Sequence, residues 1–262
     1  MKAGRLPVIS LLTDFGTADY FVGAVKGAIL SVNPQAVIAD ITHEIAPQDI
    51  LAGAFTLLAA YKTFPAGTIH VAVVDPGVGS TRCPIIVSAN QQFFVGPDNG
   101  IFTYIYDREP AHRIFHVTAK KYFRRDQSST FHGRDIFAPV AAALSNGVKP
   151  RKFGPVIDDA IRLPDPLGPE KLKNGGVRAR IIHIDRFGNC VTNLTSDLVK
   201  ANATLIINRK TIREFRKFYG EDSAKMPFAI WGSAGFLELS VNGGSAAKLL
   251  RAKRGSAVTL HQ

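Results

Sequence analysis

The run from Thr68 to Val74 (TIHVAVV) constrains the fold more than any other segment of the chain. Apart from His70, its residues are small, β-branched and apolar at successive positions, as in a strand buried on both faces of a parallel sheet. A glycine-rich turn follows and carries Asp75 and Arg82. Because ligands of open α/β sheets bind at the carboxyl ends of strands, we expect both residues at a functional site. The alternative is that Asp75 only accepts hydrogen bonds within its turn and Arg82 is solvated.

Segments on both sides of this strand alternate between strand and helix signals. Strands are predicted at Pro7 to Leu12 and Ala36 to Ile41, and helices at Asp19 to Val32 and Gln48 to Phe64. This β-α-β-α-β order predicts a mainly parallel sheet flanked by helices, and therefore an α/β fold. Further along, the pattern predicts a hairpin of Pro84 to Ser88 with Gln91 to Val95, a strand at His112 to Val117, and a helix at Gly133 to Leu144.

Five prolines between Lys149 and Lys173 indicate a connection between two domains. Beyond it the predicted strands are short and separated by turns, which suggests a small antiparallel barrel or sandwich. The predicted organisation is an N-terminal α/β domain over residues 1–160, a linker over 161–174 and a smaller C-terminal β-barrel domain over 175–262. The C-terminal strands are expected at Val177 to Ile184, Val191 to Leu194, Ala203 to Ile207, Phe228 to Trp231, Phe236 to Ser240 and Ala257 to Leu260.

Composition favours a soluble globular protein, with 46% apolar and 20% charged residues among 262. The formal net charge of +11 invites a nucleic-acid function, but the basic residues are spread along the chain and no nucleic-acid module is recognisable, which favours a solvated basic surface. Cys83 and Cys190 have no disulfide or zinc-ligand spacing, so a reducing cytoplasm is expected. No segment is long and apolar enough to span a bilayer, and no membrane partner is expected.

Three polar residues outside the central turn are candidates for the site. Asp14 lies on a strand-to-helix turn, where one carboxylate can accept from both hydroxyls of a ribose diol. Its alternative role is helix capping, for which Asp19 is the better placed residue. His132 lies on a glycine-flanked turn that opens a helix, and His43, also at a strand end, is the second candidate histidine. Most histidines are packed or surface residues, which is the alternative for both.

Several motifs, taken together and in order, give the chain a resemblance to a known family. They are TDFGTADYFVGAVKG, DITHEI, VVDPGVGSTR, GPDNG, STFHGRDIFAP, IDRFGNCVTN and NGGSAAKLL. Nearly the whole chain resembles the S-adenosylmethionine hydroxide adenosyltransferases, which are related to fluorinating and chlorinating enzymes acting on the same substrate. The resemblance implies an N-terminal α/β domain, a C-terminal β-barrel and a homotrimer. It places each active site between the N-terminal domain of one subunit and the C-terminal domain of its neighbour.

Chemically, the resemblance implies that water or hydroxide cleaves S-adenosylmethionine at the ribose C5′, which gives adenosine and L-methionine without a cofactor or metal. The family's Asp-Arg-His set corresponds here to Asp75, Arg82 and His132. Halide-using relatives have a tyrosine or another neutral residue at the position of Asp75, and a fixed carboxylate there would repel a halide. Arg82 can supply positive charge, His132 can accept the proton and Asp75 can orient either one, and the sequence leaves open which of the three holds the proton.

The resemblance also assigns the substrate contacts. Asp14 would hold the ribose hydroxyls, and Asn189 and the backbone near Gly243 would contact adenine. The residues implied for the methionine amino and carboxylate groups are Asp19, Asp185 and Ser233. Two positions depart from the family pattern: relatives can carry a serine near the match to Phe21, and an arginine where this chain has Ala234.

Three other functions stay open at this stage. A non-catalytic sensor of adenosine or S-adenosylmethionine would use the same pocket without turnover. A halide-using adenosyltransferase would release a 5′-halo nucleoside. A nucleic-acid-binding module would show salt-dependent binding.

Overall fold

The computed structural model describes residues 7–164, 167–172, 176–200, 202–221 and 225–261, and part of the predicted linker 161–174 falls outside them. The chain forms two compact units, Met1–Asp165 and Pro166–Gln262. Each unit has its own apolar core. No helix in the described ranges is long and apolar enough to cross a membrane.

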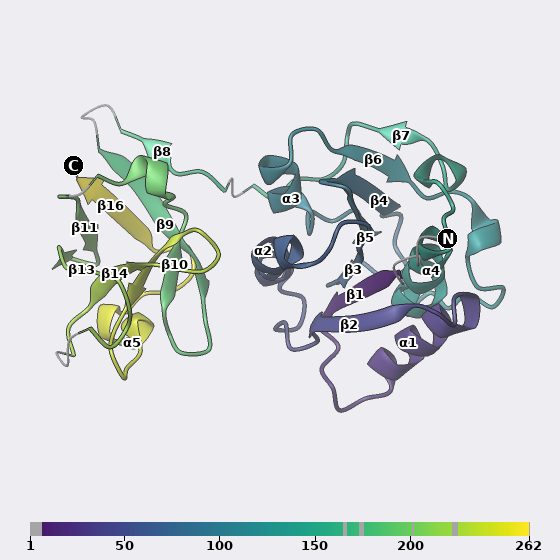
Figure 1. Cartoon of the computed structure of the whole chain (residues 1–262), viewed down its shortest axis with the longest axis horizontal. Helices are drawn as coiled ribbons and strands as arrows, with labels where there is room; N and C mark the ends of the chain where they lie inside the picture. The colour runs from purple at the N-terminus through teal and green to yellow at the C-terminus, as the bar shows by residue number, and fades with distance from the viewer. Residues whose placement is uncertain (1–6, 165–166, 173–175, 201, 222–224, 262) are drawn as a thin grey trace, which may run out of the picture. The chain divides into compact units, whose positions relative to one another are not determined.

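A mixed sheet of seven strands, in the order β2-β1-β3-β5-β4-β6-β7, forms the centre of the first unit (Figure 1). The pairs β1/β2, β1/β3 and β3/β5 are parallel, whereas β5/β4, β4/β6 and β6/β7 are antiparallel. The prediction of a mainly parallel sheet is therefore wrong for half of the pairings. Its strands are β1 (Val8–Thr13), β2 (Val37–Thr42), β3 (Ile69–Val73), β4 (Pro84–Ala89), β5 (Gln92–Pro97), β6 (Arg113–His116) and β7 (Val156–Ile157).

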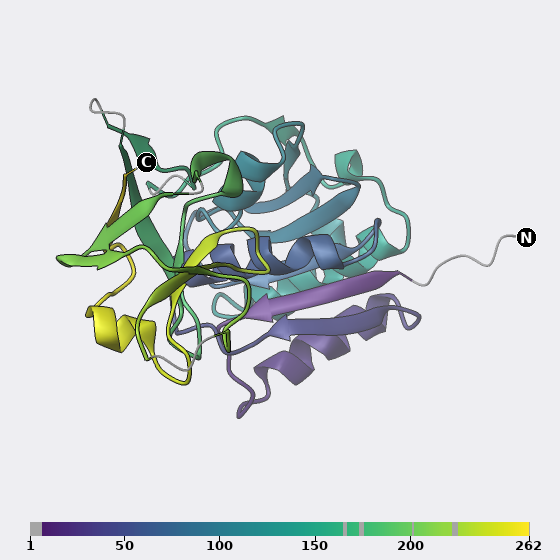
Figure 2. The same ribbon diagram turned by 60° about the vertical axis from the view of Figure 1, so that its left-hand side comes forward.

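The mixed character follows from the β4/β5 hairpin. Asn90 and Gln91 both have positive φ, of 48° and 57°, which gives a tight turn between the two strands. β5 lies parallel to β3, so β4 must run against it, and β6 and β7 then continue the sheet beyond β4. Figure 2 shows the parallel half, where the arrows of β1 and β2 point the same way.

Helices cover both faces of this sheet. Alternate residues of β1 and β3, among them Ile9, Leu11 and Val71, share a core with α1 and α4. The other helical layer pairs α2 with α3. The helices are α1 (Phe21–Val32), α2 (Ile50–Ala60), α3 (Thr103–Arg108) and α4 (Ala138–Ser145). A π-helix (Gly133–Phe137) precedes α4, which begins next to Pro139, so the proline marks a helix start and causes no kink.

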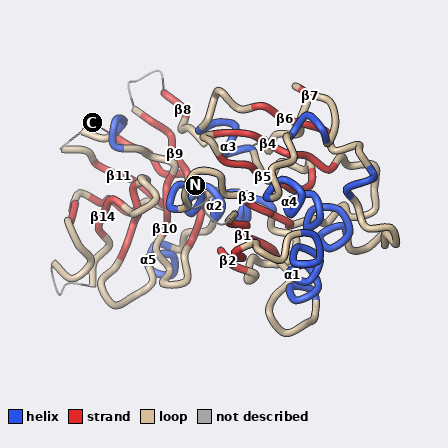
Figure 3. The backbone as a smooth tube through the Cα atoms, turned by 45° about the vertical axis from the view of Figure 1, so that its right-hand side comes forward, coloured by secondary structure: helices blue, strands red, loops and turns tan. Residues whose placement is uncertain are grey.

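The second unit is built mainly of antiparallel strands, which Figure 3 shows in red, with the short helix α5 (Ala246–Leu250) in blue at their edge. The path of pairing is β12-β11-β16-β9-β10-β15-β14-β13, with β8 beside β9. Among the described residues no pairing between β12 and β13 closes this path, so the predicted barrel is supported only in part. The strands are β8 (Glu170–Lys171), β9 (Val177–Ile184), β10 (Cys190–Thr192), β11 (Thr204–Ile207), β12 (Lys210–Ile212), β13 (Phe215–Arg216), β14 (Phe228–Trp231), β15 (Leu237–Ser240) and β16 (Ala257–His261).

Candidate active site

A cavity of about 400 Å³ lies at the carboxyl ends of β1 and β3 in the first unit, and we call it the N-terminal cavity. The predicted residues Asp14, Asp75 and His132 all line it. This is the sheet edge at which parallel strands of open α/β folds present their ligand-binding loops. The other lining residues are Phe15, Phe21, Pro47, Gln48, Val73, Pro76, Val78, Thr130, Phe131 and Gly133.

Arg82 lies behind this lining and joins the other two predicted catalytic residues. Its Nε donates to Asp75 Oδ1 at 2.7 Å, and its Nη2 donates to Asp75 Oδ2 in a fork-like pair. The same Nη2 lies 3.0 Å from His132 Nδ1. The side chains of Arg82 and Asp75 are only 7% and 4% exposed. The acid, guanidinium and imidazole that the family resemblance implies as a set therefore meet at one point.

The contact with Arg82 determines which nitrogen of His132 carries the proton. A guanidinium only donates hydrogen bonds, so Nδ1 must accept and a neutral ring carries its hydrogen on Nε2. Burial and the nearby Arg82 charge both lower the pKa of His132 below its ordinary value, although Asp75 and Asp135 act in the opposite direction. The ring is accordingly a neutral hydrogen-bond donor through Nε2 at neutral pH.

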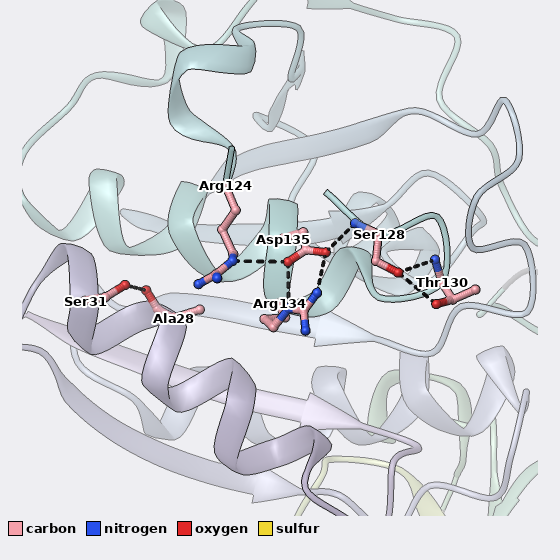
Figure 4. A network of polar contacts seen from close by, with 7 residues as sticks. All are labelled: Ala28, Ser31, Arg124, Ser128, Thr130, Arg134 and Asp135. Atoms are coloured by element: carbon pink, nitrogen blue, oxygen red, sulfur yellow. Dashed lines mark hydrogen bonds and ion pairs between the residues drawn. The ribbon is translucent and has the colours of Figure 1, made fainter. Parts of the chain in front are cut away.

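An ionic network around one buried carboxylate holds the loop that carries His132 (Figure 4). Asp135 is fully buried and accepts hydrogen bonds from Arg134 Nε at 2.7 Å and from the Ser128 backbone N–H at 2.8 Å. Arg124 approaches the same carboxylate at 3.3 Å. Burial raises the pKa of Asp135, but the bonds from Arg134 and Ser128 outweigh it and hold the pKa below its usual range. Asp135 and Arg134 therefore anchor the loop, rather than forming only a surface pair.

The turn after β3 packs directly on this loop. Gly79 has φ +80°, and a Cβ added there would lie 2.4 Å from the Ser129 carbonyl oxygen. Only glycine combines this backbone conformation with such a close approach. The contact ties the turn that carries Asp75 and Arg82 to the loop that carries His132.

Three aromatic rings form an apolar wall of the N-terminal cavity that the sequence analysis did not predict. The ring centroid of Phe131 lies 5.8 Å from that of Phe15 and 5.2 Å from that of Phe21. Both contacts are edge-to-face, a favoured aromatic geometry. Their place in the sequence could have indicated this wall, since Phe15 directly follows Asp14 and Phe131 directly precedes His132.

Apart from Asp19, the remaining predicted contacts gather in a second cavity, of about 690 Å³, which lies in the second unit and which we call the C-terminal cavity. Asp185, Asn189, Ser233 and Gly243 line it, together with Phe187, Tyr219, Glu238, Val241 and Gly244. Asp185 accepts the backbone N–H of Asn189 at 2.8 Å on Oδ1 and its side-chain Nδ2 at 2.8 Å on Oδ2. Since the Asn189 amide nitrogen is directed to Asp185, its Oδ1 is available to accept from a ligand.

Glu238 and Tyr219 of the C-terminal cavity are further residues that sequence reasoning missed. The Tyr219 hydroxyl donates to Glu238 Oε2 at 3.1 Å. Burial raises the pKa of Glu238 above its ordinary value, and Asp185 adds to the effect. A glutamate in a strand and a tyrosine in a loop carry no motif that would have marked them. A separate cavity of about 420 Å³ beside β8 and β9 contains none of the predicted residues.

Besides Arg82, two residues singled out in the sequence line neither cavity. Asp19 is exposed, and α1 has Tyr20 at its N-cap with no side-chain capping bond, so the expected capping role of Asp19 is wrong. Asp14 does not cap α1 either, and its carboxylate accepts the Gln48 backbone N–H at 2.8 Å. His43 is 5% exposed and packs between strands. In the described ranges no cluster of three or more His, Cys, Asp or Glu side chains is arranged to hold a metal ion.

The fold and the cavities define a two-unit protein with a polar site in each unit. The first unit is α/β and carries an Asp-Arg-His cluster at the ends of its parallel strands, and the second is β-rich and has its own polar cavity. Two family models match it: SAM hydroxide adenosyltransferase N-terminal domain over residues 9–154 and SAM hydroxide adenosyltransferase C-terminal domain over residues 179–259. The chain belongs to the SAM hydroxide adenosyltransferase family.

Individual relatives support the same assignment. The chain is 39% identical to an (R)-S-adenosyl-L-methionine hydrolase of Methanocaldococcus jannaschii, with 95% of this chain and 94% of that protein covered. It is 35% identical to the Thermus thermophilus protein of the same name, with 96% and 98% covered. A fluorinase of Actinoplanes sp. is 26% identical over 77% of this chain and 76% of its own. A crystal structure of an uncharacterized conserved protein from Thermotoga maritima superposes with a TM-score of 0.89 at 34% identity, covering 97% of this chain and 100% of that one.

Proposed function

We propose that this protein hydrolyses S-adenosyl-L-methionine to adenosine and L-methionine. The observation that carries the proposal is the Asp75–Arg82–His132 cluster on the N-terminal cavity of a chain that is 35–39% identical to relatives named as hydrolases of this substrate. In the proposed reaction a water oxygen attacks the ribose C5′, the C5′–S bond breaks with its electron pair going to sulfur, and one proton is released.

The geometry supports distinct roles for the three residues. Asp75 lines the cavity and can accept a hydrogen bond from the attacking water and then its proton. His132 donates through Nε2 to the water oxygen and so orients its lone pair toward C5′. Arg82 acts from behind as a positioning residue, because it fixes the Asp75 carboxylate and the tautomer of His132. Among the residues that the sequence leaves open as the proton acceptor, this arrangement favours Asp75, since His132 Nδ1 lies against the Arg82 donor.

Substrate binding is proposed to use both cavities. The ribose hydroxyls would contact Asp14, adenine would contact Asn189 and the backbone near Gly243, and the methionine end would contact Asp185 and Ser233, with Asp19 reaching it from a loop. We further propose that a homotrimer pairs the N-terminal cavity of one subunit with the C-terminal cavity of its neighbour. A cytoplasmic location, the independence from cofactors and the closed C-terminal barrel stay predictions from the sequence and the resemblance.

Incubation of the pure protein with S-adenosylmethionine tests the proposed reaction. Chromatography is expected to show adenosine and methionine released in equal amounts. Tight binding without products would instead support a sensor. Addition of chloride or fluoride tests the alternative that the fluorinase relatives suggest, and a 5′-halo nucleoside as the main product would overturn the proposal.

The shared site can be tested by mixing two inactive variants. Asp75→Asn damages only the N-terminal cavity and Asn189→Ala only the C-terminal cavity. If the sites lie between subunits, co-expression restores part of the activity, because some interfaces then combine two intact cavities. No recovery from assembled mixed oligomers would refute the intersubunit arrangement.

A further inference from the structure

His43 connects the ends of β1 and β2 beneath the turn that carries Asp14. Its Nδ1 lies 2.9 Å from Thr13 Oγ1, and its Nε2 lies 3.2 Å from Asp40 Oδ1. Thr13 and His43 are only 1% and 5% exposed. Despite the order Asp-His-Thr, this is no nucleophilic triad, because the buried hydroxyl does not line the N-terminal cavity.

The chemistry of these groups gives their hydrogen bonds one direction. The Asp40 carboxylate also receives Lys26 Nζ at 2.6 Å, and its negative charge 3.2 Å from His43 Nε2 favours the hydrogen on that nitrogen, although this contact is an electrostatic approach and not an aligned hydrogen bond. Nδ1 then accepts from the Thr13 hydroxyl. The Thr13 oxygen in turn accepts the Phe15 backbone N–H at 3.3 Å. Both neighbours of Asp14 are thereby held by one chain of polar contacts.

Backbone contacts hold the same turn at two further points. The Gly16 N–H donates to the His43 carbonyl at 2.8 Å, and the Ile45 N–H donates to the Thr13 carbonyl at 3.4 Å. A register shift in the β1/β2 pairing lies just before them, since Leu11 pairs with Asp40 but Leu12 pairs with Thr42. Such a bulge redirects the end of a strand, here β2 toward the turn after β1.

The result for Asp14 is a carboxylate with one oxygen held and one free. Oδ2 accepts the Gln48 N–H at 2.8 Å, whereas Oδ1 has no hydrogen-bond partner among the described residues. Asp14 lines the N-terminal cavity. The position of its free oxygen depends on the turn that His43 and Thr13 hold.

From this geometry we infer that His43 is a positioning residue for nucleoside recognition, and that it acts through Thr13 to present Asp14 to the ribose hydroxyls. The inference rests on the proposed ribose-binding role of Asp14. It removes His43 from the candidates for acid–base chemistry and gives it a role in ligand selectivity.

The test compares how well the protein distinguishes adenosine from 2′,3′-dideoxyadenosine, measured by calorimetry on the full chain. Hydrogen bonds from hydroxyls to a carboxylate predict that the wild type prefers adenosine by about 10- to 100-fold. Asp14→Asn should lose most of this preference. Thr13→Val and His43→Leu should lose most of it as well, although Asp14 is intact in both.

Conservative variants separate positioning from folding. Thr13→Ser keeps the hydroxyl, and His43→Asn places an amide oxygen where Nδ1 accepts, so both should keep the preference for adenosine. Ser10→Ala is the matched control, because it removes another buried hydroxyl–histidine contact, from Ser10 Oγ to His70 Nδ1 at 2.6 Å, away from the cavity. It should lower stability and leave the preference unchanged.

Three results would overturn the inference. If Thr13→Val and His43→Leu fold and keep the wild-type preference, His43 does not act through Asp14. If Ser10→Ala loses the preference equally, the effect is a general loss of stability. If Asp14→Asn keeps the preference, the ribose role fails and the inference fails with it, while release of adenosine and methionine by the wild type would leave the proposed reaction standing.

Discussion

Replacing Arg82 by methionine separates the structural and chemical roles of the central cluster. Arg82 and Asp75 are 7% and 4% exposed, so Arg82→Met leaves a buried carboxylate without its cation. Removal of one partner from a buried ion pair costs about 3–5 kcal/mol of unfolding free energy. The variant also removes the donor to His132 Nδ1 and the contacts that orient the Asp75 carboxylate, so kcat should fall by about 100-fold or more.

Chemical denaturation and product release by chromatography measure the two effects. Arg162→Met is the matched control in the same unit. Arg162 pairs with Asp107, and their side chains are 52% and 28% exposed, so this ion pair should contribute no more than about 1 kcal/mol to the unfolding free energy. The double variant Asp75→Leu/Arg82→Met should regain most of the stability, since apolar residues can replace a buried pair, but it should stay inactive. Wild-type stability and turnover in Arg82→Met would refute the reasoning.

Three further predictions concern pH and the loop contacts. Because the pKa of His132 lies below its ordinary value, kcat/KM should stay constant down to about pH 6.5 and fall only at lower pH. Protonation there places an Nδ1 hydrogen against the Arg82 guanidinium, which also only donates. A pH–rate profile with an acid limb above 6.5 would contradict this. Burial lowers the pKa of His70 to about 4, so the folded state excludes a proton that the unfolded chain takes up below pH 6.5. His70 should therefore contribute about 3 kcal/mol to the fall in unfolding free energy by pH 4, and denaturation curves of His70→Gln should lack that contribution. Gly79→Ala should lower both stability and turnover, because its Cβ meets the Ser129 carbonyl, whereas Gly67→Ala, with φ +86° and open space, should cost only about 1–2 kcal/mol and keep turnover.

Sequence periodicity located two strands almost to the residue. β3 (Ile69–Val73) and β9 (Val177–Ile184) agree with their predicted bounds to within one residue at each end. The helices α3 and α5 were not predicted, because six and five residues are too few for helical periodicity to appear. The first two crossovers of the chain predict a parallel sheet, but the β4/β5 hairpin reverses the direction of pairing in the rest of it.

The residue types at the site were more predictable than their contacts. Strand-end polar residues and a family resemblance marked Asp14, Asp75 and His132, and all three line one cavity. The burial of Asp135 and the positioning contacts of His43 depend on tertiary packing between segments far apart in sequence. No local pattern distinguishes such buried polar residues from solvated ones.

The most direct test of the proposed chemistry is hydrolysis of S-adenosylmethionine in water enriched in oxygen-18, followed by mass spectrometry of both products. Attack of water at C5′ predicts one labelled oxygen in the 5′-hydroxyl of adenosine and none in methionine. Unlabelled adenosine, or label in a product derived from the amino acid, would contradict the account.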